Sequence, residues 1–382
     1  MLAPNTSEEL AEALGEAALR LGSISIEGRG SKRALGGPVE GADCPISTVA
    51  LNRVLEFEPH DLTISVQAGL PWRELAALVA SHRLTIPLDP PFAAEATVGG
   101  VVAANTCGPR RRLYGTARDM IIGMKFATLA GKIIQSGGMV VKNVAGLDMA
   151  KLMIGSFGTL AAIASVNFKL APAPDTERSF LLPFESLTEA MAARNSILKS
   201  PLQPAALDLL NPAASELIGK RSWMLALRAG GNEAAMRRYE RELSSYAGGV
   251  ALDSGGHETL WRRVEDFTPT FLEGHAEGAV ARASCTLMGV EEVMASFPGL
   301  GVARAGTGVC YGYFEDCTAA AEWMKGAGER GWKAVIEYAP EARKRELDLW
   351  PAPGPDFEIM TRLKKLFDPD LRLNRGRLYG RI

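Results

Sequence analysis

Glycine clusters between residues 96 and 160 constrain this chain of 382 residues more than any other feature. They lie beside turns in otherwise apolar segments, at Gly99-Gly100, Gly108, Gly115, Gly146, Gly155 and Gly158. Glycine lets the backbone approach a polar ligand closely, and successive N–H groups in a tight turn bind anions. One such glycine could be only a turn, but several together predict a site for a long, flat, phosphorylated ligand. The backbone, without any need for arginine, would hold its phosphates.

The order of the motifs adds a second signal. The motifs are Thr97-Val98-Gly99-Gly100, Gly108-Pro109-Arg110-Arg111, Gly115-Thr116-Ala117-Arg118-Asp119, Lys142-Asn143-Val144-Ala145-Gly146-Leu147-Asp148 and Leu152-Met153-Ile154-Gly155-Ser156-Phe157-Gly158-Thr159-Leu160. Together they resemble the flavin-binding domain of the vanillyl-alcohol-oxidase and p-cresol-methylhydroxylase type. Within that type the chain is most similar to the FAD-binding (E) subunits of bacterial glycolate oxidase complexes. The resemblance covers the first half of the chain and, in the second half, only the tail.

The resemblance implies FAD as the cofactor. The cofactor-binding residues that it implies are Gly28, Gly30, Ser31, Pro90, Thr97, Val98, Gly99, Gly100, Asn105, Gly108, Tyr114, Gly115, Asp119, Lys142, Ala145, Gly146, Asp148, Gly155, Ser156, Gly158, Thr159 and Asn374. In relatives a glycine turn at the place of residues 28–32 wraps the diphosphate; the same turn could equally be a bare hairpin. Lys142 is the best cation for the neighbourhood of the flavin N1 and N5 atoms.

The C-terminal tail carries the rest of the resemblance. Its Asp368-Pro369 and Asn374-Arg375-Gly376-Arg377 are similar to a closing signature that returns to the flavin domain in relatives, where Asn374 would hydrogen-bond the ring. An ordinary frayed terminus is the alternative. Pro91 or Phe92 could face the isoalloxazine ring or belong to the core. Cys107 could attach flavin covalently, although a small packing residue is the simpler interpretation.

Composition excludes several classes of protein. With 47% hydrophobic and 23% charged residues and a net charge of -2, the chain is typical of a globular protein and gives no reason to expect nucleic acid or an anionic membrane as partner. Five cysteines are scattered without a C-x-x-C spacing, so an iron–sulfur cluster would have to lie in a partner. The N-terminus lacks the pattern of an export signal, so we expect a cytoplasmic protein that reaches the inner face of the membrane only through its partners.

Hydrophobic periodicity predicts an α+β fold. Thr6-Ser7-Glu8-Glu9 predicts a capping box at the start of a helix, and alternation predicts a strand at 24–26 and a hairpin of 121–126 with 132–135. A helix is expected at 147–154. Two prolines at 171–175 mark a break. We therefore predict a two-part FAD-binding domain at 1–172, an α+β cap or partner-binding domain at 173–366, in which helices cover one side of antiparallel strands, and a returning tail at 367–382.

The catalytic residues are not evident from the sequence. Its four histidines are isolated, so no metal-binding pair and no independent substrate site are predicted. Rossmann, P-loop and G-x-S-x-G motifs are absent. The resemblance implies the FAD-binding subunit of a glycolate dehydrogenase (glycolate oxidase) complex, which oxidises glycolate to glyoxylate with a larger catalytic flavoprotein subunit and an iron–sulfur subunit. The alternatives are a self-sufficient FAD-dependent D-2-hydroxy-acid dehydrogenase and a degenerate flavin fold kept as a scaffold.

Overall fold

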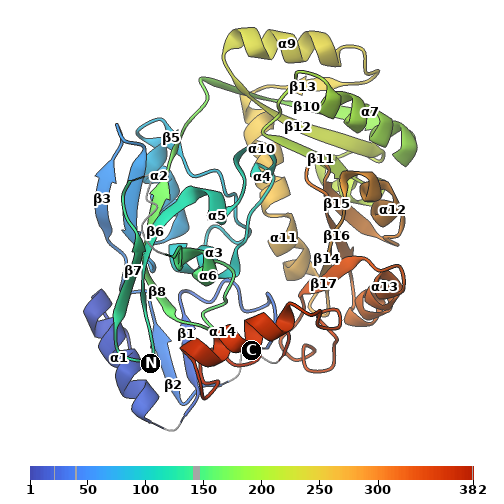
Figure 1. Cartoon of the computed structure of the whole chain (residues 1–382). Helices are drawn as coiled ribbons and strands as arrows, with labels where there is room; N and C mark the ends of the chain where they lie inside the picture. The colour runs from blue at the N-terminus through green and yellow to red at the C-terminus, as the bar shows by residue number, and fades with distance from the viewer. Residues whose placement is uncertain (21, 39–40, 141–146, 381) are drawn as a thin grey trace. The chain divides into compact units, whose positions relative to one another are not determined.

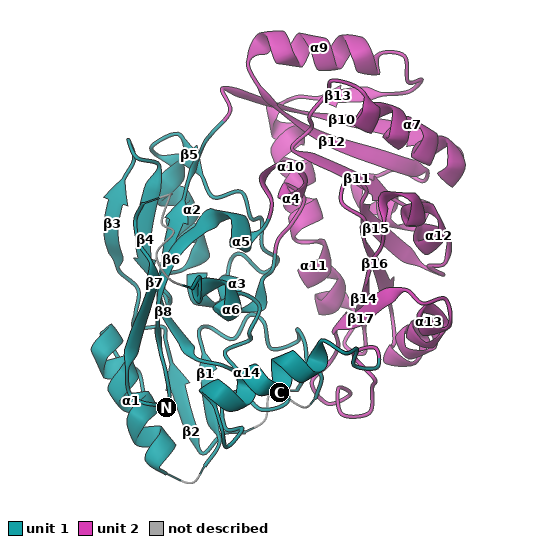
Figure 2. Cartoon of the chain, in the orientation of Figure 1, with its two compact units in different colours: residues 1–106, 116–173, 352–382 teal, residues 107–115, 174–351 magenta. Residues whose placement is uncertain are grey.

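The computed structural model describes residues 1–20, 22–38, 41–140, 147–380 and 382. The chain divides into two compact units (Figure 2): the first holds residues 1–106, 116–173 and 352–382, and the second holds 107–115 and 174–351. These bounds differ from the domains expected at 1–172 and 173–366 in three places, the first being residue 173, which belongs to the first unit. Residues 107–115 belong to the second unit and 352–366 to the first.

The first unit contains three sheets and the helices around them (Figure 1). Its elements are α1 (Ser7–Leu19), β1 (Ile24–Glu27), β2 (Cys44–Ser47), β3 (Val54–Glu58), β4 (Thr63–Gln67), α2 (Trp72–Ala80), β5 (Leu84–Thr85), α3 (Val98–Ala104), α5 (Ala117–Met120), β6 (Ile121–Ala127), β7 (Ile133–Gly137), α6 (Ala150–Met153), β8 (Ala162–Lys169), β9 (Ala171–Pro172) and α14 (Phe357–Phe367). The five-stranded sheet has the order β3-β4-β8-β6-β7, β1 pairs with β2, and β5 pairs with β9.

Helix α1 packs its apolar face on this unit's core. Leu10 and Leu14 are fully buried together with Ile24, Ile46 and Leu373. The helix begins as expected, because the Thr6 side chain accepts a hydrogen bond from the Glu9 N–H. The Glu9 carboxylate, however, accepts from the Asn5 N–H and not from that of Thr6. The expected hairpin of β6 and β7 is confirmed.

The second unit is built on one eight-stranded sheet. Its elements are α4 (Arg111–Tyr114), β10 (Thr176–Phe184), α7 (Leu187–Lys199), β11 (Ala206–Leu210), α8 (Pro212–Ser215), η1 (Glu216–Ile218), β12 (Trp223–Gly231), α9 (Glu233–Leu243), β13 (Val250–Leu252), α10 (Ser254–Glu265), α11 (Phe267–Gly274), β14 (Ala279–Ser284), η2 (Leu287–Gly289), α12 (Val290–Ala295), β15 (Leu300–Arg304), β16 (Val309–Phe314), α13 (Cys317–Glu329) and β17 (Lys333–Tyr338). The strand order is β13-β10-β12-β11-β15-β16-β14-β17, and every neighbouring pair is antiparallel.

The two faces of this sheet differ in what covers them. One face and helices α7, α9, α12 and α13 form a large apolar core that includes Leu209, Leu227 and Ile336. On the other face, α10 donates a hydrogen bond from Trp261 to Ser179 of β10, and α11 places Thr268 against Tyr313 of β16. The α+β class with an antiparallel-sheet second domain is confirmed. The expectation that helices cover one side only is wrong, because α10 and α11 pack on the opposite face.

Two local expectations also need correction. Strands β1 and β2 are parallel, with Ile24 opposite Cys44, so the glycine turn at 28–32 does not close a hairpin between adjacent antiparallel strands. The helix expected at 147–154 is only the single turn α6. Within the described residues, no helix has the length and apolar character needed to cross a membrane.

Candidate functional site

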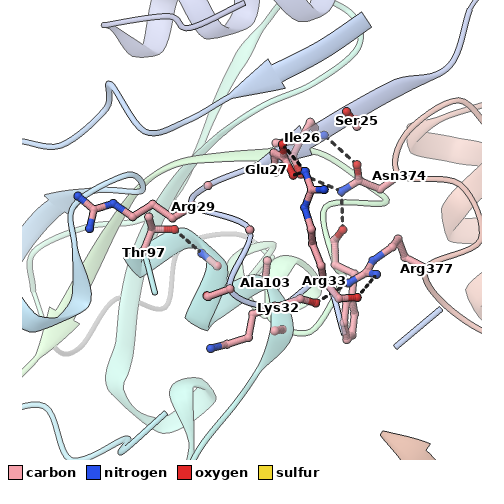
Figure 3. Close-up of a pocket in the computed structure, with 16 residues that line it drawn as sticks. Ser25, Ile26, Glu27, Arg29, Lys32, Arg33, Thr97, Ala103, Asn374 and Arg377 are labelled. Atoms are coloured by element: carbon pink, nitrogen blue, oxygen red, sulfur yellow. Dashed lines mark hydrogen bonds and ion pairs between the residues drawn. The ribbon is translucent and has the colours of Figure 1, made fainter. Parts of the chain in front are cut away.

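A pocket in the first unit gathers segments from the beginning, middle and end of the chain (Figure 3). Its lining residues are Ser25, Ile26, Glu27, Gly28, Arg29, Gly30, Ser31, Lys32, Arg33, Thr97, Gly100, Ala103, Ala104, Phe157, Asn374 and Arg377. Its volume is about 110 Å³, well below the roughly 300–1,000 Å³ of pockets that enclose a whole drug-sized ligand. It would therefore hold one part of a dinucleotide.

The turn after β1 supplies backbone donors to this pocket. Among the described residues, no acceptor takes a hydrogen bond from the N–H groups of residues 28 to 32, all of which line the pocket. Gly30 has a positive φ of 74°, a conformation that favours glycine. Successive N–H groups without partners form an anion-binding concavity, and each charge-assisted bond contributes roughly 1.5–3 kcal/mol. The turn therefore fits the diphosphate role expected for it.

Gly28 lies against Thr97, the first residue of the expected motif Thr97-Val98-Gly99-Gly100. A Cβ added at Gly28 would lie 2.3 Å from the Thr97 Oγ1. That hydroxyl caps α3 by accepting a hydrogen bond from the Gly100 N–H at 3.3 Å. The absence of a side chain at residue 28 therefore allows the turn to pack against the start of α3.

The glycine pair does not act as the sequence suggested. Gly99 donates its N–H to the Ala68 carbonyl at 2.7 Å, Val98 donates to the Leu70 carbonyl, and Gly100 donates to Thr97. The expected row of uncovered N–H groups is therefore absent at 98–100, because these donors are already used. A Cβ at Gly99 would come within 2.8 Å of the Ala68 Cβ, so this glycine permits close packing.

Lys32 brings a cation to the pocket from a buried position. Its side chain is 8% exposed, its ammonium donates to the Pro91 carbonyl, and the Nζ lies 5.1 Å from the centre of the Phe92 ring. Burial lowers the pKa of Lys32 to about 7, although the Glu95 carboxylate opposes the shift. A bound diphosphate would favour the protonated amine and raise this pKa.

The C-terminal tail closes the pocket from another side (Figure 3). Arg377 is buried and donates to the carbonyls of Lys32, Arg33 and Gly37, with its guanidinium 5.4 Å from the centre of the Phe157 ring. Arg377 therefore holds the 28–32 turn in place through these hydrogen bonds. The tail is not a frayed end, since it is held to the first unit by these bonds.

Asn374 has a role other than the one expected. Its side-chain amide donates to the carbonyls of Ile26 and Phe157, at 3.2 and 2.7 Å, and its oxygen accepts from the Ile26 N–H at 2.8 Å. Both amide hydrogens are thus used by the protein backbone. Asn374 lines the pocket, but the structure shows it joining β1 to the 155–159 turn, and a donor from it to a flavin ring stays a prediction.

The turn at 155–159 is shaped by two glycines. Gly155 and Gly158 have φ angles of 79° and 70°, and a Cβ at Gly158 would come within 2.6 Å of the Asn374 amide nitrogen. Ser156 and Thr159 bond within the turn. The Thr159 carbonyl accepts from the buried ammonium of Lys364, which also pairs with Asp368 at 2.7 Å. The tail motif Asp368-Pro369 therefore has a structural role.

The remaining predicted residues lie elsewhere. Pro90, Val98 and Gly99 are buried and do not line the pocket. Asn105 ends α3 with a φ of 50°, Asp119 accepts from the Thr116 N–H at the start of α5, and Asp148 is exposed, 3.9 Å from Lys151. Three other predicted residues, Gly108, Tyr114 and Gly115, belong to the second unit. Three more, Lys142, Ala145 and Gly146, lie outside the described residues.

Sequence reasoning missed part of the pocket lining. The residues missed are Ser25, Ile26, Glu27, Arg33, Ala103, Ala104, Phe157 and Arg377. Phe157 had a local signal, because it lies between two glycines and adopts a positive φ of 54°. No local feature of the sequence predicted the ion pair between Arg33 and Glu27, whose charged atoms lie 2.8 Å apart. In the part of the chain that the structure describes, no three His, Cys, Asp or Glu side chains form a group that could hold a metal ion.

Comparison with protein families identifies the cofactor. Residues 1–137 match the family model described as FAD binding domain. These residues include Gly100 and the whole 28–32 turn, and the turn carries the unpaired N–H groups of the pocket. The chain is therefore a flavoprotein, and FAD is its cofactor.

The curated relatives are oxidoreductases. The chain is 35% identical over 199 residues to glycolate oxidase subunit GlcE of Escherichia coli, covering 52% of this chain and 55% of the relative. It is 32% identical over 214 residues to glycolate oxidase subunit GlcD of Bacillus subtilis, covering 55% and 45%, and 33% identical over 189 residues to a D-lactate dehydrogenase of Anaerostipes hadrus, covering 49% and 40%. The chain spans about half the length of these relatives.

Solved structures share the fold at low sequence identity. An alkyldihydroxyacetonephosphate synthase matches with a TM-score of 0.71 and 16% identity, covering 97% of this chain and 76% of the other. A 4-ethylphenol oxidase from Gulosibacter chungangensis matches with a TM-score of 0.74 and 14% identity, covering 99% and 88%. The arrangement of an FAD-binding domain with an antiparallel-sheet domain is therefore shared by proteins that differ widely in sequence.

Proposed function

We propose that this chain is the FAD-binding subunit of a glycolate oxidase-type complex that oxidises glycolate to glyoxylate. The observation that carries the proposal is the row of unpaired N–H groups at 28–32, beside the buried Lys32, within the part of the chain that matches an FAD binding domain. The similarity to subunits of glycolate oxidase supports the choice of complex and of substrate.

Different residues of the pocket would bind the cofactor and hold the binding turn in place. The N–H groups of the 28–32 turn and the Lys32 ammonium would bind the diphosphate, and Arg377 would keep the turn in place from behind. Bound FAD supplies an acceptor for the hydride that leaves the hydroxyl-bearing carbon of a 2-hydroxy acid. Lys142, Ala145 and Gly146 are proposed as further cofactor contacts on the resemblance alone.

The proposed partners are a larger catalytic flavoprotein subunit and an iron–sulfur subunit. The relatives named as glycolate oxidase subunits support the existence of partners. The five cysteines of the chain have no C-x-x-C spacing of the kind that holds an iron–sulfur cluster. Electrons would therefore pass from the flavin to a cluster held by another chain.

A self-sufficient FAD-dependent D-2-hydroxy-acid dehydrogenase is the second candidate. It is favoured by the similarity to a D-lactate dehydrogenase and by a group of arginines and tyrosines on the sheet of the second unit. The two candidates differ in whether the chain alone can reduce its flavin with substrate.

The test is the absorption spectrum of the purified chain, followed by anaerobic addition of glycolate. A bound flavin that stays oxidised until the partner subunits are added supports the complex. Bleaching of the flavin in the chain alone would favour the second candidate. Failure of the wild-type chain to bind FAD would contradict both, and a Gly100→Trp variant serves as the control that should lose flavin.

A further inference from the structure

The face of the second unit's sheet on which α10 and α11 pack also carries a cluster of arginines and a tyrosine. The strand register places Arg282 of β14 directly opposite Tyr311 of β16. Tyr311 is opposite Val302 of β15, whose second neighbour along the strand is Arg304. Because side chains two residues apart point to the same face, Arg282, Tyr311 and Arg304 share one face of the sheet.

Contacts confirm that these side chains lie together. The Arg304 guanidinium carbon lies 5.6 Å from the centre of the Tyr311 ring. Arg282 bonds Glu337 through Nε at 3.0 Å and Ser284 through Nη1 at 2.9 Å. Arg304 pairs through Nη1 with Asp208, which is buried.

Each member of the cluster keeps donors that the protein does not use. Among the described residues, the Nε and Nη2 atoms of Arg304 and the Nη2 atom of Arg282 have no hydrogen-bond partner. Nor does any described residue accept or donate a hydrogen bond at the Tyr311 hydroxyl. Burial raises the pKa of Tyr311 far above its usual range, so the hydroxyl is a proton donor at any physiological pH.

One of these donors is costly to leave without a partner. The Arg304 Nε is buried and has no hydrogen-bond acceptor among the described residues, so it loses hydration that nothing in the protein replaces. The side chains of Arg282 and Arg304 as a whole are 31% and 13% exposed. The segment 107–115 belongs to the same unit and carries Arg111, whose Nη1 lies 3.7 Å from the Cys107 Sγ. Burial raises the pKa of Cys107, so this thiol adds no negative charge to the cluster.

We propose that Arg282, Arg304 and Tyr311 bind the carboxylate of a small organic acid. Planar guanidinium groups with free N–H donors match a carboxylate, and a phenol hydroxyl supplies a third donor. The proposal rests on the proposed function for the identity of the acid, a 2-hydroxy acid, but not for the site itself. It gives the chain a substrate-recognition site that the isolated histidines did not suggest.

The test is calorimetric titration of the FAD-loaded chain with oxalate, a carboxylate that has no hydride to give. The wild-type chain should bind oxalate, and Tyr311→Phe and Arg282→Gln should each weaken binding about tenfold, the size expected for a hydrogen bond to a charged group. Tyr311→Phe removes only a hydroxyl that has no protein partner, so its fold should be unchanged. Arg238→Gln removes an exposed arginine that pairs with Glu242 on α9 and is the matched control.

Two results would overturn the inference: no binding of oxalate to the wild-type chain, or equal affinity in the wild-type, Tyr311→Phe and Arg282→Gln proteins. The flavin spectrum of each sample is recorded in parallel. Loss of oxalate binding with full flavin occupancy concerns this site. Absence of flavin from the wild-type chain contradicts the proposed function, and oxalate is then titrated into the flavin-free chain to test the site by itself.

Discussion

Gly28→Ala is the substitution that tests the pocket most directly. The added methyl group would lie 2.3 Å from the Thr97 Oγ1 and 3.1 Å from its Cγ2, and real contacts of this kind do not fall below about 3.0 Å. Gly28 does not have a positive φ, so alanine meets no backbone strain there. The Thr97 side chain must therefore turn away and lose its bond to the Gly100 N–H.

The magnitude follows from the lost cap. Removing a threonine N-cap costs about 1 kcal/mol, within a range of roughly 0.5–2. We expect Gly28→Ala to lower the free energy of unfolding by about 1–2 kcal/mol and to weaken FAD binding about tenfold or more, because the turned side chain enters the pocket. Thr97→Ala alone should cost about 1 kcal/mol.

A double-mutant cycle separates this mechanism from general damage. In the Thr97→Ala background only the Thr97 Cβ remains, 3.3 Å from the new methyl group, so Gly28→Ala should cost about 1 kcal/mol less than in the wild type. Urea unfolding of the apoprotein and flavin fluorescence titration measure the two effects. Gly41→Ala, with no atom within 4 Å of the added Cβ, is the control. Equal costs of Gly28→Ala in both backgrounds would refute the reasoning.

Three further predictions follow from buried charges. FAD affinity should be constant below pH 7 and fall as the pH rises above it, because the pKa of Lys32 is about 7 without the diphosphate and higher with it; a Lys32→Met variant whose FAD affinity keeps this slope would exclude the explanation. Lys364→Met leaves the buried Asp368 charge unpaired and should cost about 3–5 kcal/mol in urea unfolding, whereas Arg362→Gln, in an exposed pair, should cost less than about 1. Burial alone would raise the pKa of Glu177, but bonds from His257 and Arg228 lower it to about 2. This carboxylate should therefore contribute roughly 3 kcal/mol above its unfolded pKa of 4.5, lost as the pH falls toward 2; a Glu177→Gln protein with the wild-type pH dependence of unfolding would contradict it.

Local features of this fold could be predicted from residues that are neighbours in the chain. The Thr6 cap, the β6–β7 hairpin and the positive φ of Gly155 and Gly158 follow from residue types a few positions apart. The glycine-rich stretch likewise indicated a flavin cofactor, which the family match confirms.

The backbone donors that remain available to a ligand depend on contacts made in the folded chain. The N–H of Gly99 is used by Ala68, which is distant in sequence, while the N–H groups of the turn at 28–32 have no acceptor among the described residues. The resemblance predicts that Asn374 hydrogen-bonds the flavin ring, but in the structure its side-chain amide donates to the carbonyls of Ile26 and Phe157. Contacts between segments that are distant in sequence decide which acceptor each N–H group finds. The hydrophobic periodicity of one segment does not predict those contacts.

For the same reason, the arginine cluster of the second unit could not be predicted from the sequence. Arg282 and Tyr311 are far apart in the chain and meet only because β14 and β16 pair in one register, and a shift by one residue would send Tyr311 to the apolar face. The sequence predicted an α+β second domain and a flavin cofactor. The pairing of strands determined which charged side chains stand together, because register depends on the whole sheet.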